Sequence, residues 1–215
     1  MTYNKETIFN LLKDLPLDGD FYEEKNDLFI EYIKDTFYYD NGASKFVLIP
    51  KDPNADFVIK IPYNGSLHGD DFWEEYCGAE NDADRPWDYC ATEVYRFFIA
   101  KEHGLAECFA ETKFLDFIND YPIYIQERCV PLSTNLDRSK HPLKETTKTL
   151  SLCGTKLEFI NVNWLTDFRL YYGEDIFVDF VNFVSENGWD DDLRSDNIGY
   201  IDDRPVLIDY SGFWE

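Results

Sequence analysis

The sequence predicts an α+β fold in which a small lobe built on an antiparallel sheet precedes a reduced, mainly helical second lobe. The first observation is the order of the elements: strand-like segments lie on both sides of one helix, and a polar stretch and a strong amphipathic helix follow. The second is the composition of the 215 residues, of which 44% are hydrophobic and 18% aromatic, enough for a sizeable core. We expect one domain over residues 1–215, with the small lobe at about 1–130 and a truncated large lobe at about 131–215.

The small lobe is expected to begin with a helix and continue into strands. Residues 4–14 place apolar side chains at helical spacing and predict the helix, with Asn4 or Thr7 as its cap. Residues 45–50 and 57–63 are rich in β-branched residues and predict strands. The stretch 27–40 fits a helix or a strand. Turn signals bound the two strands, at residues 41–44 and 51–56.

A helix and two more strands are predicted next. The helix runs from about 87 to 103 and stops at the "HG" pair, and the segments "TKFLDFI" and "YPIYIQERCV" read as strands around an "NDYP" turn. The polar residues 131–156 are interpreted as a bridge between the lobes. Residues 174–188 predict an amphipathic helix because Ile176, Phe177, Phe180, Phe183 and Val184 share one face.

The net charge of this chain is unusually negative. Asp and Glu number 43 and Lys and Arg 20, which gives a net charge of −23. Such a surface repels phosphate backbones and anionic lipid, so we expect neither a nucleic acid nor a membrane as partner. A solvated acidic surface is the simplest interpretation, and divalent cations or a basic protein are the alternatives. Residues 69–88, read as a loop or short helix, carry eight carboxylates against one arginine.

Cysteines and histidines do not predict a metal centre. The five cysteines are scattered without a CxxC pair, and together with the three histidines they form no zinc pattern. We interpret them as reduced, mostly buried thiols of a cytoplasmic protein. The N-terminal sequence has no long apolar run, so neither a signal peptide nor a membrane span is expected.

Three polar residues near the C-terminus are spaced as phosphoryl transfer would need them. That reaction uses Mg²⁺ on oxygen ligands, a cation at the phosphates and a carboxylate that receives the acceptor proton. Asn197 follows Asp192 by five residues, and Asp209 follows Asn197 by twelve, at the end of an apolar strand. A hairpin between the last two would return Asp209 to Asn197, so the three residues are candidates for one site.

These segments resemble those of protein kinases. "DLRSDN" and "LIDYSG" are similar to the catalytic loop and the metal-binding motif of that family. "FVIKI" resembles the strand with the ATP lysine, and "CATEVYRFF" the helix that follows it. "YPIYIQERCV" resembles the last strand of the small lobe as it enters the hinge. The resemblance spans roughly residues 36–212.

The resemblance implies a set of catalytic and metal-binding residues. Asp192 would be the catalytic base, and Arg194 would lie near the γ-phosphate. Lys60 would bind the α- and β-phosphates of ATP while paired with Glu93. Magnesium would be held by Asn197 and Asp209.

It also implies where the nucleotide is held. The peptide groups around Glu127, Arg128 and Cys129 would meet the adenine. Gly42 and Ser44 in "DNGASK" stand where the family has a glycine-rich phosphate loop. ATP or GTP and Mg²⁺ are the implied cofactors, and the acceptor is a protein or a small molecule that the sequence does not identify.

Three interpretations therefore stay open. The first is a minimal, ATP- and Mg²⁺-dependent kinase. The second is a weak or inactive kinase-like scaffold acting as an acidic interaction module; it is suggested by the single Gly42, by Asp190 and Asp191 where protein kinases have His and Arg, and by the expected lack of an activation segment after Gly212. The third is an acidic domain whose motifs arise by chance.

Overall fold

The computed structural model divides the chain into two compact units. The first consists of Met1–Val94 and Thr112–Glu127, and the second of Tyr95–Glu111 and Arg128–Glu215. Residues 95–111, which a lobe boundary near residue 130 would place with the small lobe, belong to the second unit. The structure describes residues 3–15, 26–41, 45–62, 88–118, 121–132, 147–152, 155–187, 193 and 195–210.

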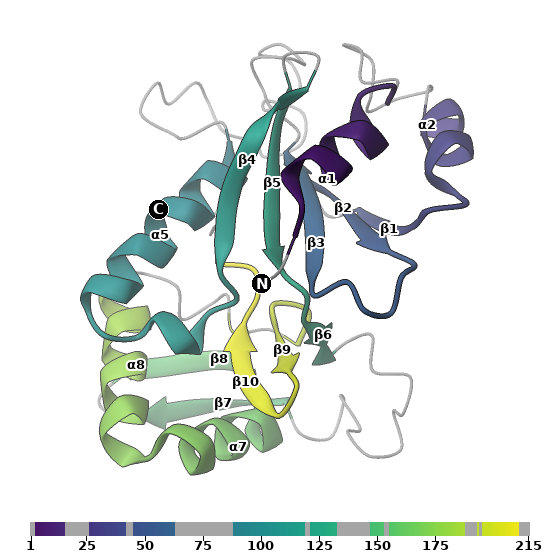
Figure 1. Cartoon of the computed structure of the whole chain (residues 1–215). Helices are drawn as coiled ribbons and strands as arrows, with labels where there is room; N and C mark the ends of the chain where they lie inside the picture. Colours follow the sequence, from purple (N-terminus) through teal and green to yellow (C-terminus); the bar gives the residue numbers. More distant parts are fainter. Residues whose placement is uncertain are drawn as a thin grey trace, which may run out of the picture. The chain divides into compact units, whose positions relative to one another are not determined.

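A five-stranded antiparallel sheet organises the first unit (Figure 1), as the α+β prediction requires. Its strand order is β1-β2-β3-β5-β4, so the last two strands along the chain are exchanged in space. The predicted strands are confirmed. The bounds are β1 (Phe37–Asn41), β2 (Lys45–Pro50), β3 (Phe57–Pro62), β4 (Thr112–Ile118) and β5 (Tyr121–Glu127).

Two short helices share the core on one face of this sheet. Helix α1 (Lys5–Leu12) confirms the first prediction, and the Asn4 carboxamide caps it by accepting the Thr7 amide N–H at 3.1 Å. The ambiguous stretch 27–40 forms helix α2 (Asn26–Ile33) and then β1. The core combines apolar side chains of both helices with those of the strands, among them Ile8, Leu12, Phe29, Ile33, Phe46, Leu48, Ile59 and Ile61.

Helix α5 (Tyr89–Glu102) confirms the helix expected at 87–103. It begins in the first unit and ends in the second, where Gly104 adopts a φ of 75° beyond its last turn. A short 3-10 helix, η1 (Ala106–Cys108), then leads towards β4.

The second unit contains two packed helices and two small sheets. Its core gathers Phe109, Trp164, Phe168, Phe180 and Tyr210, all fully buried. One sheet has the order β10-β9-β6 and the other is the hairpin β7–β8. The elements are β6 (Val130–Pro131), β7 (Thr147–Leu152), β8 (Thr155–Asn161), α7 (Val162–Tyr172), α8 (Glu174–Glu186), β9 (Ile198–Ile201) and β10 (Arg204–Leu207).

The linker expected at 131–156 is wrong in its last part, because β7 and the start of β8 occupy it. The polar strand sequence "TKTLSL" hides the alternation that normally reveals a strand. Helix α7 was not predicted at all. The Asn161 side chain starts it by accepting the amide N–H groups of Asn163 and Trp164 at 3.0 and 3.1 Å, and Gly173 with φ 85° ends it. Helix α8 is confirmed.

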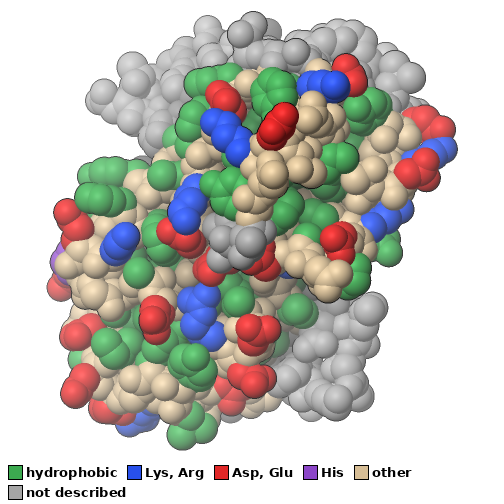
Figure 2. Space-filling model, viewed as in Figure 1, with side chains coloured by type: hydrophobic (Ala, Val, Ile, Leu, Met, Phe, Trp, Pro, Cys, Tyr) green, Lys and Arg blue, Asp and Glu red, His purple; other side chains and the backbone are tan. Residues whose placement is uncertain are grey.

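Acidic side chains are exposed on the part of the surface that the structure describes. On the face drawn in Figure 2, Asp and Glu side chains are dispersed among hydrophobic side chains and a few basic ones. None of the helices in the described ranges is long and apolar enough to cross a membrane. The acidic stretch 69–87 and the predicted turns at 42–44 and 119–120 lie outside the described residues.

Candidate functional site

The candidate site of the first unit starts from a lysine on the middle strand of the sheet. Lys60 lies on β3 opposite Val47 of β2 and Tyr124 of β5. Because strand side chains alternate, Lys60 points away from the face on which Ile59 and Ile61 join the core. The residue is only 3% exposed, although it carries a full charge.

Glu93 comes from the second turn of helix α5 and is fully buried. The position of the helix is set by Asp88. Its Oδ1 accepts the amide N–H groups of Cys90 and Ala91, both at 2.9 Å, and its Oδ2 accepts the Tyr124 hydroxyl at 2.5 Å. The cap therefore ties the start of α5 to strand β5 and aims Glu93 at the sheet.

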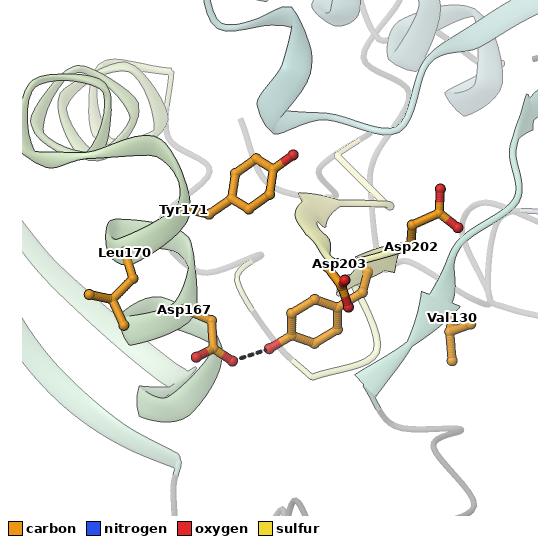
Figure 3. Close-up of a pocket in the computed structure, with 7 residues that line it drawn as sticks. Val130, Asp167, Leu170, Tyr171, Asp202 and Asp203 are labelled. Atoms are coloured by element: carbon orange, nitrogen blue, oxygen red, sulfur yellow. Dashed lines mark hydrogen bonds between the residues drawn. The ribbon is translucent and has the colours of Figure 1, made fainter.

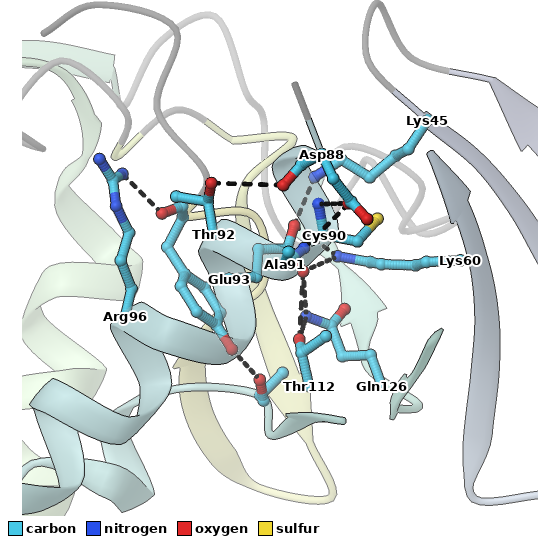
Figure 4. Close-up of polar contacts among 12 residues, drawn as sticks. Lys45, Lys60, Asp88, Cys90, Ala91, Thr92, Glu93, Arg96, Thr112 and Gln126 are labelled. Atoms are coloured by element: carbon cyan, nitrogen blue, oxygen red, sulfur yellow. Dashed lines mark hydrogen bonds and ion pairs between the residues drawn. The ribbon is translucent and has the colours of Figure 1, made fainter. Parts of the chain in front are cut away.

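Lys60 and Glu93 form a buried ion pair, which is the pairing that the sequence resemblance implies. The Lys60 ammonium donates to Glu93 Oε1 at 2.9 Å and to Oε2 at 2.8 Å. The Thr112 hydroxyl donates to Oε2 at 3.1 Å. Gln126 Nε2 donates to the Thr112 hydroxyl at 2.8 Å and approaches Glu93 Oε2 at 3.4 Å. Figure 4 shows these side chains converging on the one carboxylate.

Sequence reasoning missed three members of this network: Lys45, Thr112 and Gln126. The Lys45 ammonium also contacts Glu93 Oε1, and Lys45 is 3% exposed. Lys45 lies two residues before Val47, the cross-strand neighbour of Lys60, so both lysines are on one face of the sheet; finding this needs the strand register. Thr112 and Gln126 are opposite each other across β4 and β5, and that pairing needs the sheet order.

In the second unit, the hairpin β9–β10 returns Asp209 to Asn197, as the spacing predicted. The Asn197 carbonyl accepts the amide N–H of Ile208 at 2.7 Å and that of Asp209 at 3.4 Å. Asn197 is 7% exposed, and Asp209 is half-buried. An amide oxygen and a carboxylate are the hard donors that suit Mg²⁺.

Tyr210 anchors the segment directly after Asp209. Its carbonyl accepts a hydrogen bond from Arg96 Nη1 at 2.8 Å, and its hydroxyl donates to the Ala110 carbonyl at 2.7 Å. Its fully buried ring packs edge-on against Phe109, with the ring centroids 5.2 Å apart. Three contacts from α5 and the segment after η1 thus hold the backbone at Asp209.

The structure describes only some of the other predicted site residues. Glu127 ends β5, and Cys129 precedes β6; both are half-buried. Asp192, Arg194 and the loop residues Gly42 and Ser44 lie outside the described residues. Lys60 with Glu93 therefore belongs to the first unit, and Asn197 with Asp209 to the second. Among the residues that the structure describes, no three His, Cys, Asp or Glu side chains converge as a metal cluster.

Two of the described cysteines, Cys90 and Cys108, are poor nucleophiles. Cys90 and Cys108 are buried, as expected, and Cys129 is half-buried. Burial raises the pKa of Cys108 to about 12, and burial likewise raises the pKa of Cys90 well above its usual value despite the nearby Lys45 ammonium.

An acidic pocket of about 640 Å³ lies in the second unit (Figure 3). The Asp167 carboxylate accepts the Tyr200 hydroxyl at 2.7 Å, and Leu170 is 78% exposed. Asp202 starts the turn of the β9–β10 hairpin with φ 53°, a conformation that Asp tolerates. The lining residues described come from α7 (Asp167, Leu170, Tyr171), from the hairpin (Tyr200, Asp202, Asp203) and from Val130 of β6.

The candidate site is interpreted from its own residues, because comparison with known proteins identified no relative. No protein family, no curated protein and no solved structure matches this chain.

Proposed function

We propose that this chain is a kinase-like phosphotransferase that binds a Mg²⁺–nucleoside triphosphate, ATP or GTP. The observation that carries the proposal is the buried ion pair between Lys60 on the third strand and Glu93 on the helix that follows. This is the structural context in which protein kinases hold their phosphate-binding lysine. The return of Asp209 to Asn197 supports it independently.

The burial of the Lys60–Glu93 ion pair supports a functional role, because such a pair is a costly way to stabilise a fold. Taking two charges out of water costs several kcal/mol per ion, and apolar side chains of similar size often stabilise a fold equally well. Thr112 and Gln126 add hydrogen bonds that hold the carboxylate in one orientation. An ammonium fixed in this way is preorganised for an anionic ligand and loses little entropy when the ligand arrives.

Each candidate residue has a role in the proposal. Lys60 binds the phosphates, and Asn197 and Asp209 hold Mg²⁺. Asp192 receives the proton of the acceptor hydroxyl, and Arg194 meets the γ-phosphate. The backbone around Glu127 and Cys129 meets the adenine. The acceptor is a protein or a small molecule with a free hydroxyl group.

Thermal unfolding tests the proposal directly. Mg²⁺–ATP at one hundred times its dissociation constant should stabilise the protein by about 2.7 kcal/mol. Lys60→Met and Asp209→Asn should each reduce the shift, because they remove a phosphate cation and a magnesium ligand. The matched controls are Lys51→Met and Asp203→Asn, which change exposed side chains near the same elements. A well-folded sample whose melting temperature is unchanged at millimolar Mg²⁺–ATP would contradict the proposal.

The acidic pocket favours a second candidate function, the binding of a basic protein segment. Three carboxylates, two tyrosines and two aliphatic side chains line it, and none of the described lining residues is Lys or Arg. Such walls suit the aliphatic stem and the charged head of an arginine or lysine.

For that candidate, a fluorescent Arg-rich peptide should bind in low salt and lose affinity as salt screens the charges. The double variant Asp202→Asn/Asp203→Asn should weaken binding several-fold more than Asp175→Asn/Asp179→Asn, which removes two exposed charges of α8 outside the pocket. Fluorescence anisotropy measures the affinity of the peptide for each double variant. An equal loss in the two double variants would show that the attraction comes from the overall charge and not from the pocket.

A further inference from the structure

The acidic pocket of the second unit also gathers exposed apolar side chains. Leu170 is 78% exposed, the largest fraction among the large hydrophobic side chains that the structure describes, and Val130 and Tyr171 are 57% and 53% exposed. All three border the same cavity of about 640 Å³. Apolar side chains that gather in one exposed place with polar residues around them are typical of an interaction site, whereas scattered ones are not.

The carboxylates of the pocket come from two different elements. Asp167 shares one face of helix α7 with Leu170 and Tyr171, because the three are spaced i, i+3 and i+4. Asp202 and Asp203 form the two-residue turn between β9 and β10. Figure 3 shows the side chains of the helix and those of the hairpin on two sides of the pocket. A cation that bridges the two sides needs donors that point in several directions.

The geometry of the walls favours a guanidinium over an ammonium group. The Tyr200 hydroxyl donates to Asp167 Oδ2 at 2.7 Å and so helps to hold that carboxylate in one orientation. A held carboxylate suits the planar fork of N–H donors that an arginine presents. The exposed Tyr171 ring adds a flat surface for cation–π stacking, which arginine uses more often than lysine. An ammonium group is compact and strongly hydrated, so it gains less from both features.

We propose that the pocket is a docking site for an arginine side chain of a partner protein, in a segment where an aliphatic residue adjoins that arginine. The inference rests on the second candidate function and names the residue that the pocket selects. The guanidinium bridges the carboxylates of α7 and the hairpin and stacks on Tyr171, while the aliphatic neighbour covers Leu170 and Val130. The net charge of −23 makes a positively charged partner complementary to this chain.

Fluorescence anisotropy with three labelled peptides tests the selectivity. Each peptide has one variable residue between two leucines in a glycine–serine background, and that residue is arginine, lysine or citrulline, the neutral isostere of arginine. The arginine peptide should bind about 2- to 5-fold more tightly than the lysine peptide, as expected from an exposed cation–π contact. It should bind about 10-fold more tightly than the citrulline peptide, which lacks the charge.

Two tyrosine variants locate the source of the preference. Tyr171→Leu should abolish the preference for arginine over lysine, because it removes the ring and keeps an apolar side chain. Tyr95→Leu is the matched control, since it replaces another exposed tyrosine of the second unit that does not line the pocket, and it should leave the preference unchanged.

The outcomes separate the inference from the candidate function on which it rests. Equal affinity of the wild type for the arginine and lysine peptides, or a preference that persists in Tyr171→Leu, would overturn the selection of arginine and leave the binding of basic segments standing. Equal affinity for the arginine and citrulline peptides, or no binding of any peptide, would overturn both. None of these results bears on nucleotide binding.

A second measurement applies if Tyr171→Leu does not fold. An arginine peptide with a photoreactive benzophenone in place of one leucine is then cross-linked to the wild type, and the labelled residues are identified by mass spectrometry. Labelling of α7 or of the β9–β10 hairpin is expected, and labelling of other segments alone would overturn the inference.

Discussion

Replacing Glu93 with glutamine should lower the free energy of unfolding by about 3–5 kcal/mol, the cost typical of breaking a buried ion pair on one side. The change removes the charge of a carboxylate that both Lys45 and Lys60 contact, and it leaves a neutral amide beside the two buried ammonium groups. Urea unfolding followed by far-UV circular dichroism measures the loss. Glu102→Gln at the exposed end of the same helix is the matched control and should change stability by less than about 0.5 kcal/mol.

A second substitution tests the cause of that loss. Adding Lys45→Met to Glu93→Gln should recover part of the stability, because one of the two ammonium groups that contacted Glu93 is removed. An additive or larger loss in the double variant would mean that Glu93 acts by packing and not by charge. A Glu93→Gln variant as stable as Glu102→Gln would contradict the buried network itself.

Replacing Asp192 with asparagine should lower kcat by about 10²- to 10⁴-fold, the usual contribution of a positioned general base. ATP binding should stay nearly intact, because this carboxylate is proposed to face the acceptor hydroxyl and not the nucleotide. Asp209→Asn should damage both binding and turnover, since it removes a proposed magnesium ligand. Arg194→Ala should fall between the two if its guanidinium meets the γ-phosphate.

The measurement is ATP hydrolysis or phosphoryl transfer by the purified wild type beside these three variants. Asp190 and Asp191 precede Asp192 directly, so Asp190→Asn and Asp191→Asn are the controls for a neighbouring carboxylate that substitutes for it. Equal trace activity in the wild type and in all three site variants would identify the turnover as contamination. The acidic interaction module would then be the better account of this protein.

Most elements could be predicted because their signals are local. The β-branched runs of β2 and β3 and the apolar stripe of α8 each repeat with the period of their own structure. The return of Asp209 to Asn197 followed from a short hairpin, whose register depends on a two-residue turn. The hairpin β7–β8 was not predicted, because the polar sequence of β7 masks the period of a strand there. Helix α7 was missed although Trp164, Leu165 and Phe168 lie at helical spacing on its buried face.

The sequence by itself determined the α+β class and the charge. The pairing of Lys60 with Glu93 was an expectation implied by the resemblance to protein kinases, and the structure contains that ion pair. Only the tertiary structure decided the rest of the network. Lys45, Thr112 and Gln126 reach Glu93 because β2, β3, β5 and β4 lie in that order and in one register, and Arg96 reaches the Tyr210 carbonyl across more than a hundred residues. Such contacts join segments far apart in the chain, so neither spacing nor propensity along the sequence contains them.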